Sequence, residues 1–202
     1  MAEAKVEALV FDLGGVIVAH DDAYMHARLS RRCAPDADPD AIADLTREPR
    51  WETGAPISGL HAAMSERFGY RGDWPAFAAD WCCHLKINPS MLAYVEALAR
   101  GRRVMIFSNT NAEHWNFVVA AAEGRLNAFE RHLSHELGLR KPHGDVYAAV
   151  ARAAGLAPRS LLFFDDRPAN VEAARRAGFQ AELFVDEPTL RASLLARGLH
   201  VV

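Results

Sequence analysis

The sequence predicts an α/β fold in which a Rossmann-like parallel sheet is covered by helices and interrupted, after its first strand, by a helical insertion. Two observations support this prediction. From about residue 89 onward, short apolar runs alternate with amphipathic segments, which is typical of a parallel sheet with helices on both faces. Residues 20–88 lack this alternation and show helical spacing in a stretch rich in alanine, aspartate, arginine and tryptophan.

The length of the chain agrees with this division. Its 202 residues exceed what one small domain needs and fall short of two average domains. We therefore expect a core domain of residues 1–19 and 89–202 and a cap-like helical domain of residues 20–88, here called the helical insertion.

The first predicted strand covers residues 6–12, an apolar run that ends at Asp12 and is followed by Gly14 and Gly15. Such a run before paired glycines indicates a buried strand that enters a tight turn. Within the helical insertion, residues 59–68 and 75–84 are predicted to form short helices.

The second half of the chain predicts a regular succession of elements. Ser90 is suited to begin a helix and Gly101 to end it. Further helices are expected at 111–122, 145–154 and 169–177, and strands at 103–107, 132–136, 160–164 and 181–185.

Composition and charge exclude several classes of protein. Half of the residues are hydrophobic and the net charge is −3, so the chain lacks the basic surface of a general nucleic-acid binder. No apolar run approaches the length of a membrane span, and residues 1–5 do not resemble a signal peptide. The three cysteines suit neither a disulfide framework nor a zinc site. We expect a cytoplasmic protein, either a monomer or a homodimer, that binds neither nucleic acid nor membrane.

Polar residues end three of the predicted strands. The first ends at Asp12, the second at Ser108 and Asn109, and the fourth at Asp165 and Asp166. Each group alone would have an ordinary explanation as a turn or a helix cap. Parallel strands, however, bind ligands beyond their carboxyl ends, where helix N-termini also favour anions. The sequence therefore predicts that these residues meet at one phosphate-binding site.

Lys141 is the fourth candidate element of this site. A lone lysine is usually a solvated surface charge, but Pro142 restricts the chain here and a helix follows. A lysine held inward beside several carboxylates would neutralise their repulsion and hold a phosphoryl oxygen.

Together these segments resemble the haloacid dehalogenase superfamily of hydrolases over nearly the whole chain. The resemblance rests on residues 11–16 (Phe-Asp-Leu-Gly-Gly-Val), residues 107–111 (Phe-Ser-Asn-Thr-Asn), Lys141-Pro142, and residues 163–170 (Phe-Phe-Asp-Asp-Arg-Pro-Ala-Asn). The helical insertion takes the place of the helical cap found in subfamily IA. Within the superfamily, residues 108–111, 137–142 and 163–166 are most similar to bacterial α-glucose-1-phosphate phosphatases.

The resemblance implies a mechanism and a metal site. Asp12 would attack phosphorus and form an aspartyl-phosphate. Mg²⁺ would be held by the Asp12 carboxylate, the Gly14 carbonyl and the Asp166 carboxylate, a set of oxygen ligands that this cation prefers. Asp165 is implied as a second acidic ligand or as one that acts through water. Asn170 stands where the family often has another aspartate and would support the site by hydrogen bonding.

The phosphate site follows from the same resemblance. Ser108, the Asn109 backbone N–H and Gly15 would contact the phosphate, with Lys141 as its cationic clamp. The helical insertion would close over the site and contact a small phosphorylated metabolite. Trp51, Trp74, Trp81 and His84 lie in this insertion, and their residue types favour a place in its core over contact with the substrate.

Gly14 is a departure from the family pattern. Most phosphatases of the superfamily carry an aspartate two residues after the nucleophile, which serves as general acid and base. Three readings remain open at this point. The leaving group could need little protonation, as in a sugar 1-phosphate. Another residue could substitute, with His20, Asp21 and Asp22 as the nearest candidates. Alternatively, the protein has lost activity and binds a phosphorylated ligand or a protein.

The sequence therefore favours a Mg²⁺-dependent phosphatase of small phosphorylated metabolites. Two alternatives are a non-catalytic binding protein, suggested by Gly14, and a metal-independent 2-haloacid dehalogenase. The pair Asp165 and Asp166 disfavours the dehalogenase, because two acids beside Asp12 would repel a carboxylate substrate.

Overall fold

The computed structural model describes residues 5–201, so both ends of the predicted core domain, residues 1–4 and 202, lie outside the described residues. Its centre is a five-stranded sheet in the order β5-β4-β1-β6-β7, with every neighbouring pair parallel. The strands are β1 (Ala8–Phe11), β4 (Arg103–Ser108), β5 (Glu130–Leu133), β6 (Leu161–Asp165) and β7 (Gln180–Leu183). The predicted α/β fold with a parallel sheet is confirmed.

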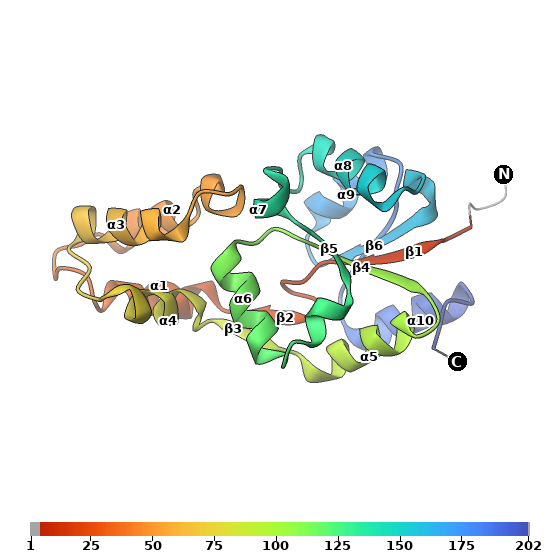
Figure 1. Cartoon of the computed structure of the whole chain (residues 1–202), viewed down its shortest axis with the longest axis horizontal. Helices are drawn as coiled ribbons and strands as arrows, with labels where there is room; N and C mark the ends of the chain where they lie inside the picture. The colour runs from red at the N-terminus through yellow and green to blue at the C-terminus, as the bar shows by residue number, and fades with distance from the viewer. Residues whose placement is uncertain (1–4, 202) are drawn as a thin grey trace.

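Helices cover both faces of this sheet (Figure 1). One face packs against α5 (Pro89–Ala99), α6 (Ala112–Ala121) and α10 (Glu187–Ala196), and the other against α8 (Gly144–Ala154) and α9 (Pro168–Arg176). Successive strand residues point to opposite faces, so Leu9 and Phe11 join the first layer and Val10 the second. This is why the three central strands, β1, β4 and β6, are largely continuous apolar runs.

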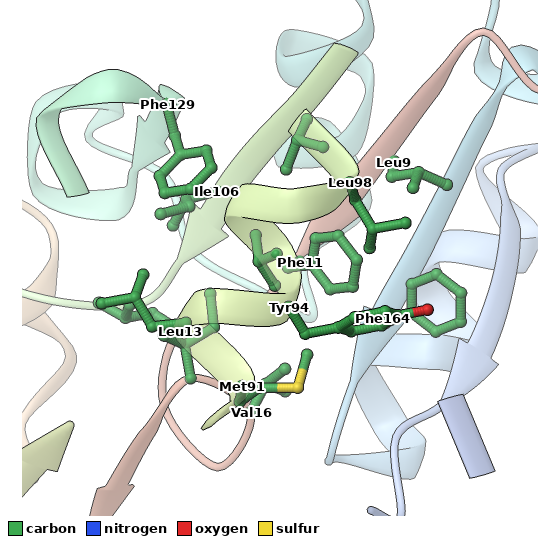
Figure 2. Close-up of a cluster of buried hydrophobic side chains, with 14 of the residues drawn as sticks. Leu9, Phe11, Leu13, Val16, Met91, Tyr94, Leu98, Ile106, Phe129 and Phe164 are labelled. Atoms are coloured by element: carbon green, nitrogen blue, oxygen red, sulfur yellow. The ribbon is translucent and has the colours of Figure 1, made fainter. Parts of the chain in front are cut away.

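The first of these layers lies directly beneath the end of β1. Figure 2 shows Leu13 and Val16, in the turn after β1, on the same cluster as Phe11, Met91 and Phe164. Phe11 and Phe164 stack with ring centroids 5.3 Å apart. The turn that follows Asp12 is therefore anchored by the buried side chains of Phe11 before it and of Leu13 and Val16 within it.

The helical insertion forms a second group of helices that extends away from the sheet (Figure 1). It contains α1 (Asp22–Ser30), α2 (Pro39–Thr46), the short 3₁₀ helix η1 (Pro49–Glu52), α3 (Ile57–Phe68) and α4 (Trp74–Cys82). These helices enclose their own apolar cluster, and the two predicted helices fall on α3 and α4. That residues 20–88 act as a separate domain stays a prediction.

A two-stranded antiparallel ribbon joins the insertion to the sheet domain. It consists of β2 (Val18–His20) and β3 (Leu85–Ile87), which pair Val18 with Ile87 and His20 with Leu85. Both strands have only three residues, too few for a recognisable alternating pattern. This ribbon and helix α10 are not among the elements expected from the sequence.

One predicted strand is misplaced. Residues 132–136 were expected to be extended, but β5 ends at Leu133 and the short helix α7 (Ser134–Leu137) follows. β5 is an edge strand that begins with the polar residues Glu130 and Arg131, so its first half gives no apolar signal.

In the described part of the chain, no helix has the length and apolar character to cross a membrane.

Candidate active site

The sheet order brings the three polar strand ends together. β1 lies between β4 and β6, with Phe11 paired to Ile106 on one side and to Phe164 on the other. The Asp12 N–H donates to the Phe164 carbonyl at 2.9 Å. β1 and β6 also flank the point where the direction of strand addition reverses, which is where open α/β sheets bind ligands.

Three carboxylates meet beyond these strand ends. Asp12, Asp165 and Asp166 each place an oxygen within 4.8 Å of the others. Asp165 is fully buried and Asp12 retains only 6% of its surface. Several carboxylates so close together and so little exposed to solvent repel one another unless cations lie beside them.

Lys141 supplies one of these cations. Its Nζ lies 3.0 Å from Asp12 Oδ1 and 2.7 Å from Asp165 Oδ2, and it donates to the Phe107 carbonyl at 3.0 Å. The side chain is fully buried. The predicted inward orientation of this lysine is thus what the structure has.

The Asn109 side chain holds the Lys141 backbone in place. Its Nδ2 donates to the Lys141 carbonyl and its Oδ1 accepts from the Lys141 N–H, both at 2.9 Å. A cis peptide bond joins Lys141 to Pro142. Asn109 therefore positions the lysine through its side chain, a contact beyond the backbone role that the sequence suggested.

The two adjacent aspartates have different surroundings. Asp165 accepts hydrogen bonds from Lys141 Nζ, from Asn170 Nδ2 on both of its oxygens, and from the Arg167 N–H. Asp166 is less buried and lines the cavity in front of Asp12. Asp165 is thus held as part of the protein framework, whereas Asp166 faces the space where a ligand would bind.

Burial sets the ionisation of these groups. It raises the pKa of Asp12 to about 8, against the opposing effect of Lys141, and the neighbouring Asp165 raises it further. Burial would also raise the pKa of Asp165, but Lys141 and the hydrogen bonds lower it overall. The pKa of Asp166 is raised by burial and by Asp165. Asp165 is therefore the carboxylate that Lys141 neutralises most directly.

The carboxylate oxygens fit a divalent metal ion. Oxygen donors are what Mg²⁺ requires, and a cation beside Asp12 and Asp166 would lower both raised pKa values. Asp165 has its oxygens engaged by other groups, so its part in a metal site would be to orient its neighbours.

Gly15 makes room for Asp166. Its φ of +73° is a backbone conformation that favours glycine, and a methyl group at this position would overlap the Asp166 carboxylate. The Gly15 N–H donates to the Val18 carbonyl at 2.8 Å. Gly15 is therefore engaged in packing and in the turn, and its predicted contact with phosphate stays a prediction.

Gly15→Ala is expected to displace Asp166 and to weaken Mg²⁺ binding about 10- to 100-fold, the usual cost of disturbing a ligand's support. Isothermal titration with Mg²⁺ would measure this change. Gly138→Ala is a matched control, because Gly138 also has positive φ, at +66°, but a Cβ added there meets no atom of residues 5–201 within 4 Å apart from its chain neighbours. Equal affinities in the two variants would contradict the prediction.

A cavity of about 530 Å³ opens in front of the carboxylates. The sheet domain lines it with Ser108, Asn109 and Lys141, and the helical insertion lines it with buried side chains that include Trp51, Trp81 and His84. Trp51 and Trp81 also belong to the core of the insertion, and Trp74 is 38% exposed and does not line the cavity.

His114 lines the same cavity and was not singled out in the sequence. It stacks on Trp81 with ring centroids 4.7 Å apart, and its ring nitrogens lie 3.2 Å from Asn111 Nδ2 and from the Trp81 carbonyl. Its only sequence signal is its place on the first turn of the helix after Asn111, whose side chain accepts from the His114 N–H.

His114→Gln is expected to reduce acid destabilisation. Burial lowers the pKa of His114 from 6.5 to about 3, so the unfolded chain binds this proton first and stability falls as pH drops from 6.5 towards 3. Each pH unit in this range changes the free energy of unfolding by ~1.4 kcal/mol, and the partial exposure of the ring reduces the effect. We therefore expect the stability that the parent loses between about pH 7 and about pH 4.5 to be smaller by about 2 kcal/mol in the variant. Urea unfolding at both pH values would measure it, with exposed His143→Gln as control.

Comparison with known proteins adds family information to this geometry. Residues 6–178 match the haloacid dehalogenase-like hydrolase family. An enolase-phosphatase E1 from Acidiphilium cryptum is 27% identical over 194 residues, which cover 87% of this chain and 83% of that protein. Phosphatase MT3486 from Mycobacterium tuberculosis is 35% identical over 98 residues, 45% of this chain, and the match spans less than half, 42%, of that relative's length.

Solved structures share the fold. The HAD family enzyme bt-2542 from Bacteroides thetaiotaomicron superposes with a TM-score of 0.82 at 22% identity, over 93% of this chain and 98% of that one. A complex of the same enzyme with magnesium and inorganic phosphate gives a TM-score of 0.80 at 22% identity, over 92% and 98% of the two chains.

Proposed function

Because the chain belongs to the haloacid dehalogenase-like hydrolase family, we propose that it is a Mg²⁺-dependent phosphatase of small phosphorylated metabolites that uses Asp12 as its nucleophile. The observation that carries this proposal is the cluster of Asp12, Asp166 and Lys141 at one wall of the cavity. The similarity to an enolase-phosphatase, and the magnesium and phosphate bound by the bt-2542 enzyme, support it.

The charges of the site suit phosphoryl transfer, whose catalysis consists mainly of positioning and electrostatic stabilisation. Asp12 would attack phosphorus through its carboxylate, one oxygen of which already accepts from the Leu13 N–H at 2.6 Å. Ser108 and the Asn109 N–H would hold the phosphoryl oxygens, with Lys141 as the neighbouring cation. Asp165, held by Lys141 and Asn170, would keep the lysine at its place.

Asp12, Asp166 and the Gly14 carbonyl would hold Mg²⁺. When bound, this cation supplies the positive charge that lets an anionic nucleophile approach an anionic phosphate. Without it, burial raises the pKa of Asp12 and favours the protonated carboxyl, which is a poor nucleophile.

A polar substrate body, such as a sugar, is the finer part of the proposal. Two buried ring nitrogens in the cavity wall, the Trp81 Nε1 donor and His84 Nδ1, have no hydrogen-bond partner among residues 5–201. Hydroxyl groups of a substrate could satisfy them. The similarity of three sequence segments to α-glucose-1-phosphate phosphatases points the same way, and it stays a prediction.

The two alternatives are less well supported. A 2-haloacid dehalogenase would place a carboxylate substrate beside Asp12 and Asp166, with Lys141 already paired to buried acids. A non-catalytic binding protein would explain Gly14, but it assigns no role to the Asp12 carboxylate that lines the cavity beside Lys141.

The test is phosphate release from a panel of sugar phosphates and other small phosphate esters, with Mg²⁺ and with a chelator. Turnover that requires Mg²⁺ is expected. Equal turnover with chelator would contradict the metal requirement. Ligand-induced stabilisation without turnover would favour the binding protein, and halide release from a 2-haloacid with chelator present would favour the dehalogenase.

A further inference from the structure

We propose that His20 is the proton donor and acceptor of this site and that it replaces the acidic side chain missing at Gly14. The inference rests on the proposed phosphatase function and specifies how the leaving group departs. It selects one residue from the three candidates that surround the entry to the helical insertion.

The backbone returns His20 to the site. After β1 the chain makes a tight turn in which the Gly15 N–H donates to the Val18 carbonyl at 2.8 Å and Gly14 forms a bridge with Val18. β2 then runs antiparallel to β3, with His20 paired to Leu85. The position of His20 is therefore fixed by main-chain hydrogen bonds on both sides.

The His20 ring lies beside Gly14. A Cβ atom built on Gly14 would be 3.7 Å from His20 Cδ2 and 4.0 Å from Nε2, and among residues 5–201, the chain neighbours Leu13 and Gly15 aside, no other atom comes within 4 Å. The imidazole thus borders the space into which an acidic side chain at this position would extend. His20 and Gly14 both line the cavity that contains Asp12 and Asp166.

Asp22 orients the ring. His20 Nδ1 lies 3.3 Å from Asp22 Oδ1, which favours the tautomer with the proton on Nδ1 and leaves Nε2 for exchange. Nε2 is also the nitrogen nearest to Gly14. A carboxylate behind a histidine is the arrangement by which proteins orient a general base.

The other candidates are engaged elsewhere. Asp21 Oδ1 accepts from the Tyr24 N–H at 2.9 Å as the N-cap of α1. Asp22 faces His20 Nδ1, with His84 Nε2 3.8 Å away. His114 has both ring nitrogens within hydrogen-bond distance of Asn111 or the Trp81 carbonyl.

The chemistry balances in two steps. His20 enters the first step as the imidazolium, with protons on both ring nitrogens. As Asp12 forms its bond to phosphorus, the bond from phosphorus to the ester oxygen breaks, and that oxygen takes the Nε2 proton to leave as an alcohol, so that His20 becomes neutral. Neutral His20 then accepts a proton from water as the water oxygen bonds to phosphorus. The bond from phosphorus to Asp12 breaks, its electron pair returns to the carboxylate, and phosphate departs.

The test compares two substrates in single-turnover and steady-state kinetics. The leaving group of 4-nitrophenyl phosphate departs without a proton, whereas that of glycerol phosphate needs one. In His20→Gln we expect the transfer of the phosphoryl group from glycerol phosphate to Asp12 to slow about 10²–10⁴-fold. With 4-nitrophenyl phosphate we expect a burst of one equivalent of nitrophenolate, followed by slow turnover because the intermediate accumulates.

A second variant and a control sharpen the result. Gly14→Asp in the His20→Gln background is expected to restore much of the glycerol phosphate turnover, since the space beside Gly14 admits a side chain. His200→Gln, an exposed histidine outside the cavity lining, is expected to behave as the parent. If His20→Gln slowed the phosphorylation of Asp12 equally with both substrates, the role of His20 would be overturned while the proposed function would stand. A parent enzyme that turns over neither substrate would overturn the proposed function and this inference with it.

Discussion

Lys141→Met is expected to destabilise the protein by about 3–5 kcal/mol, the cost of breaking a buried ion pair by removing one partner. The Lys141 ammonium is fully buried and lies within 3.0 Å of both Asp12 and Asp165. Methionine fills a similar volume but leaves two buried carboxyl groups without their cation. Urea unfolding at neutral pH without metal would measure the loss.

A double variant separates charge from packing. If the loss comes from unpaired acid, then Asp165→Asn together with Lys141→Met should cost less than the sum of the two single changes, because neither buried charge of that pair remains. Lys86→Met, at an exposed position on β3, is the matched control and should change stability by less than about 0.5 kcal/mol. A loss below about 1 kcal/mol for Lys141→Met would contradict the prediction.

The positions of the catalytic candidates could be predicted because each candidate stands at the end of a buried strand of the sheet. Strands buried on both faces are apolar without interruption, so the point where each run ends is visible in the sequence. Asp12, Ser108 and Asp165 stand at those ends, and parallel pairing brings such ends to one edge. The same argument fails for β5, where Glu130 and Arg131 hide the start of an edge strand.

The division of labour within the site could not be predicted, because it depends on contacts between distant or adjacent residues. Sequence alone does not say which of Asp165 and Asp166 points inward. In the structure two contacts distinguish the two aspartates. The Asn170 side chain, on the first turn of α9, donates to Asp165, and Gly15 leaves space for the Asp166 carboxylate. The same holds for His20, whose approach to Gly14 depends on a ribbon too short to be recognised in the sequence.

Asp12→Asn is expected to lower phosphatase turnover at least about 10⁴-fold, the scale seen when a covalent nucleophile is removed. An amide oxygen is a poor nucleophile and cannot form the acyl phosphate. Phosphate release would measure the loss, and acid-quenched labelling with radioactive substrate would show phosphate on the parent protein and none on the variant. Asp36→Asn, at an exposed position, should keep both activity and label.

The same variant should keep its fold, which distinguishes a chemical loss from a structural one. Because burial raises the pKa of Asp12 from 3.8 to about 8, the folded protein holds this proton while the unfolded chain has lost it above pH 3.8. The metal-free parent therefore loses stability as pH rises from 3.8 to about 8. The neutral amide introduced by Asp12→Asn removes this loss, so at about pH 8 without metal the variant should be at least as stable as the parent. A less stable variant, or one that still takes up label, would count against Asp12 as a buried, raised-pKa nucleophile.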